Sequence, residues 1–252
     1  MTTIDSYIQT LKVEVAKQDP VILGIAIAVL VVLVTIVLFK LITRGRNTKQ
    51  AILLVGLCDS GKTLLFSRLV HGKYVSSYTS IKENSGIYDV IGSRNKIAEV
   101  VDIPGNDRQR AQFWERYKSQ ARGVIFIIDS TTFQKEIKEV AEYLYTLLSD
   151  KTVNTQFLIA CNKQDITMAK SSKVIHQQLE KEMNTLRVTR AAALSSTDGS
   201  SSGVFLCKRN KDFEFAHLGK LKVDFADCSA KGSGGEGDPE LNMVEEWIGA
   251  LV

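Results

Sequence analysis

One octapeptide constrains the fold of this chain more than any other stretch: Gly56-Leu57-Cys58-Asp59-Ser60-Gly61-Lys62-Thr63. It follows an apolar run over residues 51–55, and an amphipathic helical pattern begins at Leu64. Glycine, four residues and then Gly-Lys-Thr, between a strand and a helix, is the phosphate-binding loop (P-loop) pattern. The sequence therefore predicts a strand–loop–helix unit that binds a polyphosphate.

The residue types of this loop suit that chemistry. Glycines permit a tight turn and a close approach to the ligand, and successive N–H groups form an anion nest at the positive end of a helix. We expect Lys62 to reach the β- and γ-phosphates and the Thr63 hydroxyl to ligate Mg²⁺. The alternative is an ordinary glycine turn between a strand and a helix. Motifs elsewhere in the chain are needed to distinguish it from a phosphate-binding loop. The predicted nucleotide contacts here are Gly56, Leu57, Cys58, Asp59, Ser60, Gly61, Lys62, Thr63 and Leu64.

Composition excludes several classes of protein. The 252 residues suffice for one large domain, or for one domain with additional segments. A net charge of +4 with no long basic stretch argues against direct binding of nucleic acid. The four cysteines are far apart and form no CxxC pair, so neither a zinc site nor a disulfide framework is indicated, and we expect reduced thiols.

An uncharged apolar run covers residues 21–39, and Leu41 and Ile42 continue it beyond Lys40. This length reaches the roughly 20 residues that a helix needs to cross a bilayer. A cleaved signal peptide would have a shorter core, a basic start and a small-residue cleavage site. A buried helix of a soluble protein is seldom apolar on all sides over such a length. We therefore expect an uncleaved transmembrane anchor over residues 20–42.

Charge next to this anchor predicts its orientation. Basic side chains follow it within a linker over residues 43–50, and the positive-inside tendency places that side in the cytosol. Residues 1–19 would then face the lumen, either along the membrane surface, as their helical apolar spacing suggests, or as a frayed tail. Residues 51–252 would form the cytosolic domain.

Further motifs follow the P-loop in the order of a magnesium and γ-phosphate site. An apolar strand over residues 96–102 pairs with a strand over 87–91 and ends in Asp102, which we expect to hold Mg²⁺ through water. Three residues later, the Gly105 N–H is placed to contact a γ-phosphate. The hydroxyl-rich loop over 74–83 is either a switch or a solvated loop. Its predicted nucleotide contacts are Ser77, Tyr78, Thr79 and Ser80, with Thr79 or Ser80 as the metal ligand.

Two later segments are typical of guanine recognition. Buried strands are predicted over 123–129 and 157–160, and the second leads into Asn162-Lys163-Gln164-Asp165. The Asp165 carboxylate can accept hydrogen bonds from the guanine ring N–H and amine, which adenine lacks. Lys163 would lie over the base and Asn162 would tie this loop to the P-loop. A last strand over 221–228 delivers Ser229, Ala230 and Lys231, with the Ala230 N–H near the guanine oxygen.

The predicted fold is a mostly parallel six-stranded α/β sheet with helices on both faces and the nucleotide at the carboxyl ends of the strands. Helices are expected over 137–148, 171–186 and 239–251, and a flexible serine-rich insertion at about 191–211.

The set Gly56-x4-Gly61-Lys62-Thr63, Asp102-x-x-Gly105, Asn162-Lys163-Gln164-Asp165 and Ser229-Ala230-Lys231 resembles that of small GTPases. Nearly the whole chain resembles the β subunits of signal recognition particle receptors. The further features that carry this resemblance are the anchor, Ala160-Cys161 before Asn162, Leu186-Arg187-Val188-Thr189-Arg190 and the serine-rich insertion. The resemblance implies an Arf-like GTPase fold that binds GTP and Mg²⁺ and an anchor in the endoplasmic reticulum membrane. It also implies a GTP-dependent interface with the receptor's α subunit, which docks ribosome–nascent-chain complexes.

Asn106 departs from the pattern of many small GTPases, which have Gln there to position the attacking water. Asn is one methylene shorter, so slow intrinsic hydrolysis is expected, and no catalytic residue is assigned. Two other hypotheses compete with a receptor subunit: an Arf-like switch that cycles by hydrolysis in vesicle traffic, and a structural anchor with a vestigial site. Intact Lys62, Thr63, Asp102 and Asp165 argue against the last.

Overall fold

The structure is a computed structural model that describes residues 25, 28–36, 38, 51–76, 80, 82–90, 96–197, 206, 212–219, 221–232 and 238–252. The chain divides into two compact units, Met1–Thr48 and Lys49–Val252.

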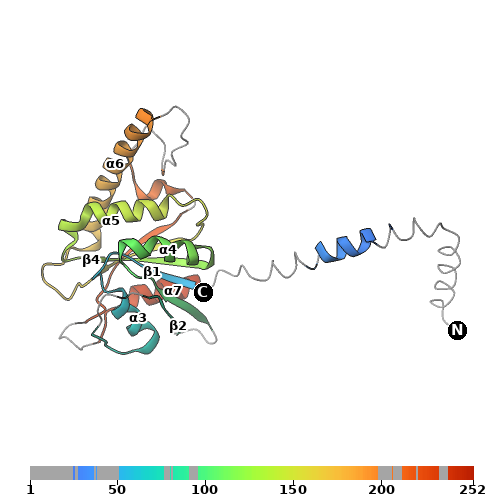
Figure 1. The fold of residues 1–252 in the computed structure, drawn as a ribbon. Coiled ribbons are helices and arrows are strands. Elements are labelled where there is room, and N and C mark those ends of the chain that lie inside the picture. The colour runs from blue at the N-terminus through green and yellow to red at the C-terminus, as the bar shows by residue number, and fades with distance from the viewer. Residues whose placement is uncertain are drawn as a thin grey trace, which may run out of the picture. The chain divides into compact units, whose positions relative to one another are not determined.

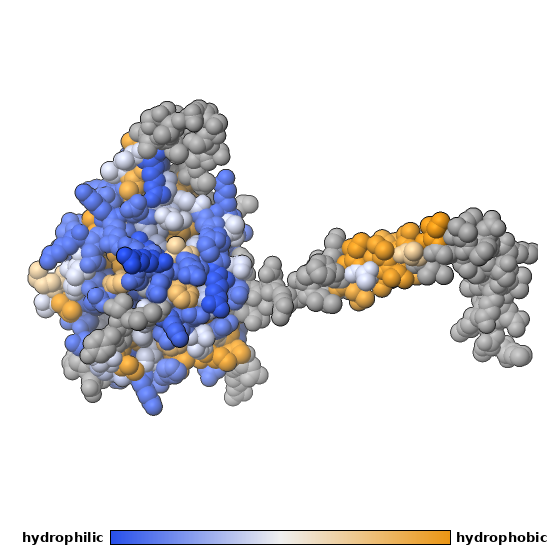
Figure 2. Space-filling view, in the orientation of Figure 1, coloured by the Kyte–Doolittle hydropathy of each residue, from blue (hydrophilic) through white to orange (hydrophobic). Residues whose placement is uncertain are grey.

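In the first unit, residues 28–36 are helical and their apolar side chains are exposed (Figure 2). No helix within the described ranges has both the length and the apolarity that a bilayer-spanning segment requires. Residues 1–19, most of the predicted anchor over 20–42 and the linker over 43–50 lie outside the described residues. The anchor and its orientation therefore stay predictions.

The second unit alternates strands and helices (Figure 1). In chain order its elements are β1 (Ala51–Val55), α3 (Lys62–His71), β2 (Asn84–Asp89), β3 (Ile97–Asp102), α4 (Asp107–Tyr117), η1 (Lys118–Gln120), β4 (Ala121–Asp129), α5 (Phe133–Leu148), β5 (Gln156–Asn162), α6 (Ser172–Thr197), η2 (Phe215–Leu218), β6 (Val223–Asp227) and α7 (Asn242–Leu251).

The strands form one six-stranded sheet in the order β2-β3-β1-β4-β5-β6. Only β2 runs antiparallel to its neighbour, and the other four pairings are parallel. The predicted six-stranded, mostly parallel sheet is thus confirmed. Because β1, β3, β4, β5 and β6 point the same way, their carboxyl ends and the loops after them meet at one edge of the sheet.

Helices cover both faces of the sheet, as predicted (Figure 1). On one face Leu53, Phe126 and Ile159 share a hydrophobic core with side chains of α4, α5 and α6. On the other face Ile52 and Leu54 pack with side chains of α3 and α7. The central strands β1 and β4 are buried on both faces, which explains their unbroken apolar sequences.

Several element boundaries differ from the predictions by a few residues, and three differences have a physical reason in the structure. Strand β2 begins at Asn84, three residues before the expected start, because its edge position leaves alternate side chains exposed and weakens the apolar signal. Helix α6 continues to Thr197 rather than ending near 186, and the alanines at 191–193 favour this extension into the predicted insertion. Helix α4 was not predicted, because its mean hydropathy is low and only Trp114 is buried.

Candidate functional site

The P-loop leaves the start of α3 open. Gly61 has a φ of 92°, in the left-handed region, and no side chain caps the helix that follows it. A Cβ on Gly61 would collide with the side-chain amide of Asn162, so glycine is required on steric as well as conformational grounds. The uncapped N–H groups of the first helical turn, together with the helix dipole, form an anion site.

Lys62 lies inside this loop rather than in solvent. Its side chain is buried, and Nζ donates hydrogen bonds to the Leu57 carbonyl and to the Ser60 hydroxyl. Burial lowers the pKa of the Lys62 ammonium, while the negative charge of Asp102 acts in the opposite direction. The lysine is therefore held by P-loop oxygens at the position where a phosphate would compete for it.

Gly105 rests directly on the P-loop. A Cβ there would lie 2.7 Å from Lys62 Nζ and 2.8 Å from the backbone nitrogen of Cys58. The loop after β3 and the P-loop thus touch, which is the contact that a γ-phosphate sensor needs.

Oxygen ligands gather beside Thr63. Its hydroxyl donates to Asp102 Oδ2 over 2.8 Å, and Ser80 Oγ lies 3.0 Å from the same hydroxyl. Asn84 also donates to Asp102 Oδ2, over 3.2 Å, and burial raises the Asp102 pKa against these two bonds. Asp102 is fully buried, and its Oδ1 has no hydrogen-bond partner among the described residues.

This group of atoms fits magnesium. Two hydroxyls and a carboxylate are hard oxygen donors of the kind that Mg²⁺ prefers, and the unpaired Asp102 Oδ1 leaves an acceptor for a metal-bound water. Of the predicted contacts in the 74–83 loop, Ser80 is the one that the structure places beside Thr63. Ser77, Tyr78 and Thr79 lie outside the described residues, so their contacts stay predictions.

Asn162 joins the two halves of the site. Its Nδ2 donates to the Ser60 carbonyl over 2.9 Å, and its Oδ1 accepts the Ala230 N–H over 3.0 Å. One buried amide therefore connects the P-loop to the loop after β6. The Ala230 N–H, expected near a guanine oxygen, is directed at Asn162 in this structure.

Asp165 and Ser229 form the adjacent polar pair. The Ser229 hydroxyl donates to Asp165 Oδ1 over 2.6 Å and accepts the Gly232 N–H over 2.9 Å. This arrangement orients the Asp165 carboxylate and fixes the loop that also carries Ala230. Lys231, next along the chain, is exposed.

A match to the family model described as "Signal recognition particle receptor beta subunit" covers residues 47–223. The human "Signal recognition particle receptor subunit beta" is 50% identical over 99% of this chain and 94% of its own length. The chain belongs to the signal recognition particle receptor beta-subunit family. A solved structure described as "The Structure of the Mammalian SRP Receptor" matches with a TM-score of 0.71 and 47% identity, over 81% of this chain and 100% of that one.

The fold extends to more distant relatives. The Chaetomium thermophilum structure described as "Signal recognition particle receptor SRb-GTP/SRX complex" has a TM-score of 0.65 at 20% identity, and covers 80% of this chain and 100% of that one. At this identity the likeness shows the fold alone. The resemblance of the sequence to signal recognition particle receptor β subunits is confirmed by the closer relatives.

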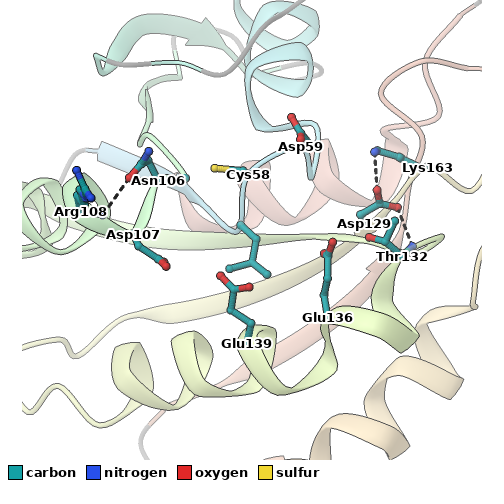
Figure 3. A pocket seen from close by; sticks show the side chains of 12 residues that line it. Cys58, Asp59, Asn106, Asp107, Arg108, Asp129, Thr132, Glu136, Glu139 and Lys163 are labelled. Atoms are coloured by element: carbon teal, nitrogen blue, oxygen red, sulfur yellow. Dashed lines mark hydrogen bonds and ion pairs between the residues drawn. The ribbon is translucent and has the colours of Figure 1, made fainter.

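A cavity of about 670 Å³ flanks the P-loop of this beta-subunit fold (Figure 3). Cys58 and Asp59 line it on the P-loop side, and Glu136 and Glu139 line it on the α5 side. Gly105 and Lys163 also line this cavity, whereas Lys62, Thr63 and Asp165 do not. The cavity therefore includes part of the predicted nucleotide site and excludes the predicted metal ligand Thr63.

Asn106 lines the same cavity, and its side chain caps the start of α4. Its Oδ1 accepts the Arg108 N–H over 3.0 Å, which makes it the N-cap of α4 (Figure 3). Asn is among the residues that cap helices best, whereas Gln is not. The departure from the glutamine of many small GTPases is therefore explained locally by the start of this helix.

Sequence reasoning missed two groups at the site. Asp129 ends β4, and it forms an ion pair with Lys163, which has a φ of 68°. Burial raises the Asp129 pKa, but hydrogen bonds from Lys163 and Thr131 outweigh it and hold that pKa below its usual range. The other missed group is Asn84, which supports Asp102. Neither residue belongs to a short motif, although Asp129 follows a buried strand whose end lies at the site.

Proposed function

We propose that this chain binds GTP with Mg²⁺ and that its GTP-bound form holds the α subunit of the signal recognition particle receptor. Its proposed place is the endoplasmic reticulum membrane, with the GTPase domain in the cytosol. There it serves co-translational protein targeting and meets ribosome–nascent-chain complexes only indirectly, through the α subunit. Thr63, Ser80 and Asp102 would hold the metal, and the metal would neutralise phosphate charge.

One observation carries the nucleotide assignment. Asn162 bonds to the P-loop carbonyl of Ser60 and to the backbone of Ala230, so the phosphate-binding and base-reading loops form one continuous surface. Asp165 lies in the same network through Ser229. A carboxylate fixed in this way favours guanine, because adenine would leave it without donors.

Family membership supports the receptor role over an Arf-like traffic switch. The Chaetomium thermophilum relative is described as a complex of SRb-GTP with SRX, and we propose a corresponding GTP-dependent partner, the α subunit, for this chain. The capping role of Asn106 further supports slow intrinsic hydrolysis, since its side chain is committed to α4. A protein of this kind works mainly as a surface that GTP holds in a binding conformation.

The partner proposal is tested by co-purification in detergent. The full chain is loaded with GTP, GDP or ATP and incubated with the α subunit of the receptor. We expect stoichiometric retention with GTP only, and its loss in Lys62→Ala, which removes the phosphate-binding amine. Lys222→Ala is the matched control, because that exposed lysine forms an ion pair with Asp224, away from the P-loop. Equal retention in all three nucleotides would contradict the proposal.

The anchor proposal requires a separate measurement. Deletion of residues 20–42 should release the chain from carbonate-washed membranes, while the intact chain remains in the membrane pellet. A protease-protection assay then tests the orientation, with residues 51–252 expected to be digested in sealed microsomes. Release of the intact chain by carbonate would contradict the anchor.

A further inference from the structure

Arg68 connects the P-loop helix to the base-reading loop. It lies in the second turn of α3, and its guanidinium donates from Nε to the Ala230 carbonyl over 3.2 Å and from Nη2 to the Lys231 carbonyl over 3.4 Å. None of the four sequence motifs contains this residue. Its contacts nevertheless reach the loop that carries Ala230 and Lys231, both predicted to contact guanine.

The geometry depends on the shape of arginine. A planar guanidinium presents several N–H donors in a fixed fork, so one side chain can hold two successive carbonyls at once. Lysine offers a point charge without this fork. Arg68 therefore fixes the orientation of two consecutive peptide groups of the loop, which a single hydrogen bond could not do.

Other bonds fix the opposite side of the same loop. Asn162 accepts the Ala230 N–H, and Ser229 is bonded to both Asp165 and the Gly232 N–H. Arg68 donates to the Ala230 and Lys231 carbonyls, which these bonds do not use. With its contacts included, the loop is held from β5 on one side and from α3 on the other.

A third contact orients the guanidinium itself. Its carbon lies 5.5 Å from the centroid of the Tyr74 ring, a distance within the range of cation–π attraction. Tyr74 follows α3 and begins the segment that leads to Ser80 at the metal site. Arg68 thus touches the P-loop helix, the base-reading loop and the start of the switch segment.

We infer that Arg68 is a positioning residue for guanine nucleotide: from α3, it holds the Ala230–Lys231 backbone in the conformation that retains the base. The inference rests on the proposed binding of guanine nucleotide. It predicts that Arg68 slows nucleotide dissociation without taking part in the phosphate or metal contacts.

The test uses the full chain in detergent, loaded with a fluorescent GDP analogue and chased with unlabelled GDP. We expect Arg68→Ala to dissociate about tenfold faster, which corresponds to about 1.4 kcal/mol. Arg68→Lys should fall between Arg68→Ala and the wild type. Tyr74→Leu should accelerate release by about threefold, since a cation–π contact between two partly buried side chains is worth less than the two hydrogen bonds. The association rate constant, and the further acceleration on Mg²⁺ chelation, should stay as in the wild type.

Arg122 provides a matched control. It also donates from Nε and Nη2 to the backbone oxygens of two successive residues, Leu251 and Val252, but at the start of β4, away from the site. Arg122→Ala should lower thermal stability and leave nucleotide dissociation unchanged. A merely structural role for Arg68 would make the two arginine variants behave alike.

The outcomes separate the two proposals. A wild-type chain that retained no guanine nucleotide would contradict the proposed function, and with it this inference. If the wild type bound GDP while folded Arg68→Ala dissociated within twofold of it, the inference alone would be wrong. Equal acceleration in Arg122→Ala would also overturn it. If Arg68→Ala does not fold, Arg68→Lys decides, with wild-type dissociation as the contradicting result.

Discussion

The proposed recognition of guanine depends on the Asp165 carboxylate. Ser229 donates to one of its oxygens, and the side chain is half-buried next to the loop that carries Ala230. A negative charge in this position demands two donors from the base, which guanine supplies from its ring N–H and its amine. An amide in place of the carboxylate has one acceptor oxygen and one donor NH₂, so it requires one donor and one acceptor from the base.

We expect Asp165→Asn to change base preference. Xanthine carries a carbonyl where guanine has its amine, and an asparagine NH₂ can donate to that carbonyl. GTP affinity should fall by about a hundredfold or more, and xanthosine triphosphate should bind in its place. Equilibrium binding of fluorescent GTP and xanthosine triphosphate measures both. Asp224→Asn, a substitution on β6 away from this network, is the control, and unchanged GTP affinity in Asp165→Asn would contradict the assignment.

Asn106 allows a separation of stability from catalysis. Because its side chain caps α4, Asn106→Ala should lower the free energy of unfolding by about 1 kcal/mol, whereas Asn106→Asp should retain the cap. Single-turnover GTP hydrolysis should change by less than about threefold, well under 1 kcal/mol of barrier. Denaturant unfolding and a rapid-quench assay supply the two numbers. A large loss of hydrolysis in Asn106→Ala would assign the residue to catalysis instead.

Sequence motifs predicted the residues whose types are fixed by the ligand, and missed those that act through other residues. Lys62, Thr63, Asp102 and Asn162 were predicted because phosphate, metal and guanine chemistry demand their types at set spacings, and the structure brings them to one edge of the sheet. Arg68 contacts the loop after β6 from α3, 162 residues before its carbonyl partner at Ala230. Such contacts depend on how helices and loops pack, so a local sequence pattern does not predict them.

Helix α4 is attached to the rest of the domain by polar contacts along one face. Arg110 pairs with Glu139, Trp114 donates to Asp150 over 3.2 Å, and Lys118, just after the helix, pairs with Asp150 over 2.9 Å. The three residues are spaced by four and so share a helical face. Asp150 contacts the end of the helix that is distant from Gly105 and the P-loop.

Asp150 makes part of the stability depend on pH. Burial raises the pKa of its carboxyl, but hydrogen bonds from Thr152, Lys118 and Trp114 outweigh burial and lower it to about 2 from 3.8. A depressed pKa means that the carboxylate stabilises the fold above about pH 4. That contribution is lost as the pH falls from 3.8 through about 2.

Asp150→Asn should therefore lower the free energy of unfolding at neutral pH by about 1 kcal/mol, a value reduced for solvent screening. The difference from wild type should vanish as the pH approaches about 2. Urea unfolding at a series of pH values measures it. Glu115→Gln is the control, because it removes an exposed carboxylate from the same Lys118. A difference that stayed constant below pH 3 would contradict the role of the charge.

At this scale, prediction from sequence succeeded where an element is buried and failed where tertiary contacts support it. Strands β1, β4 and β5 have continuous apolar sequences because both of their faces are covered. Helix α4 has a short apolar face, in which Trp114 is buried in the core and Phe113 and Tyr117 pack against it. Polar side chains supply further contacts to α5 and beyond. Its existence follows from the Asn106 cap and from packing that no local window of sequence contains.

In the whole molecule, parallel strand direction places the separate motifs at one edge. The carboxyl ends of β1, β3, β5 and β6, with the loops after them, carry the P-loop, Asp102 and Gly105, the Asn162–Asp165 segment and Ser229–Lys231, respectively. The order of motifs along the chain was sufficient to predict this convergence, since right-handed parallel crossovers leave few alternatives. The bonds of Asn162 and Arg68 across the edge are what tertiary structure adds.

Binding of a guanine nucleotide at this edge underlies the proposed receptor role and the inference on Arg68. Competition binding on the purified full chain in detergent with Mg²⁺ tests it directly. A fluorescent GTP analogue is displaced by unlabelled GTP or ATP, and the two inhibition constants are compared. We expect a preference for GTP of about a thousandfold or more. Displacement by ATP at concentrations similar to those of GTP would contradict guanine recognition by Asp165 and its network.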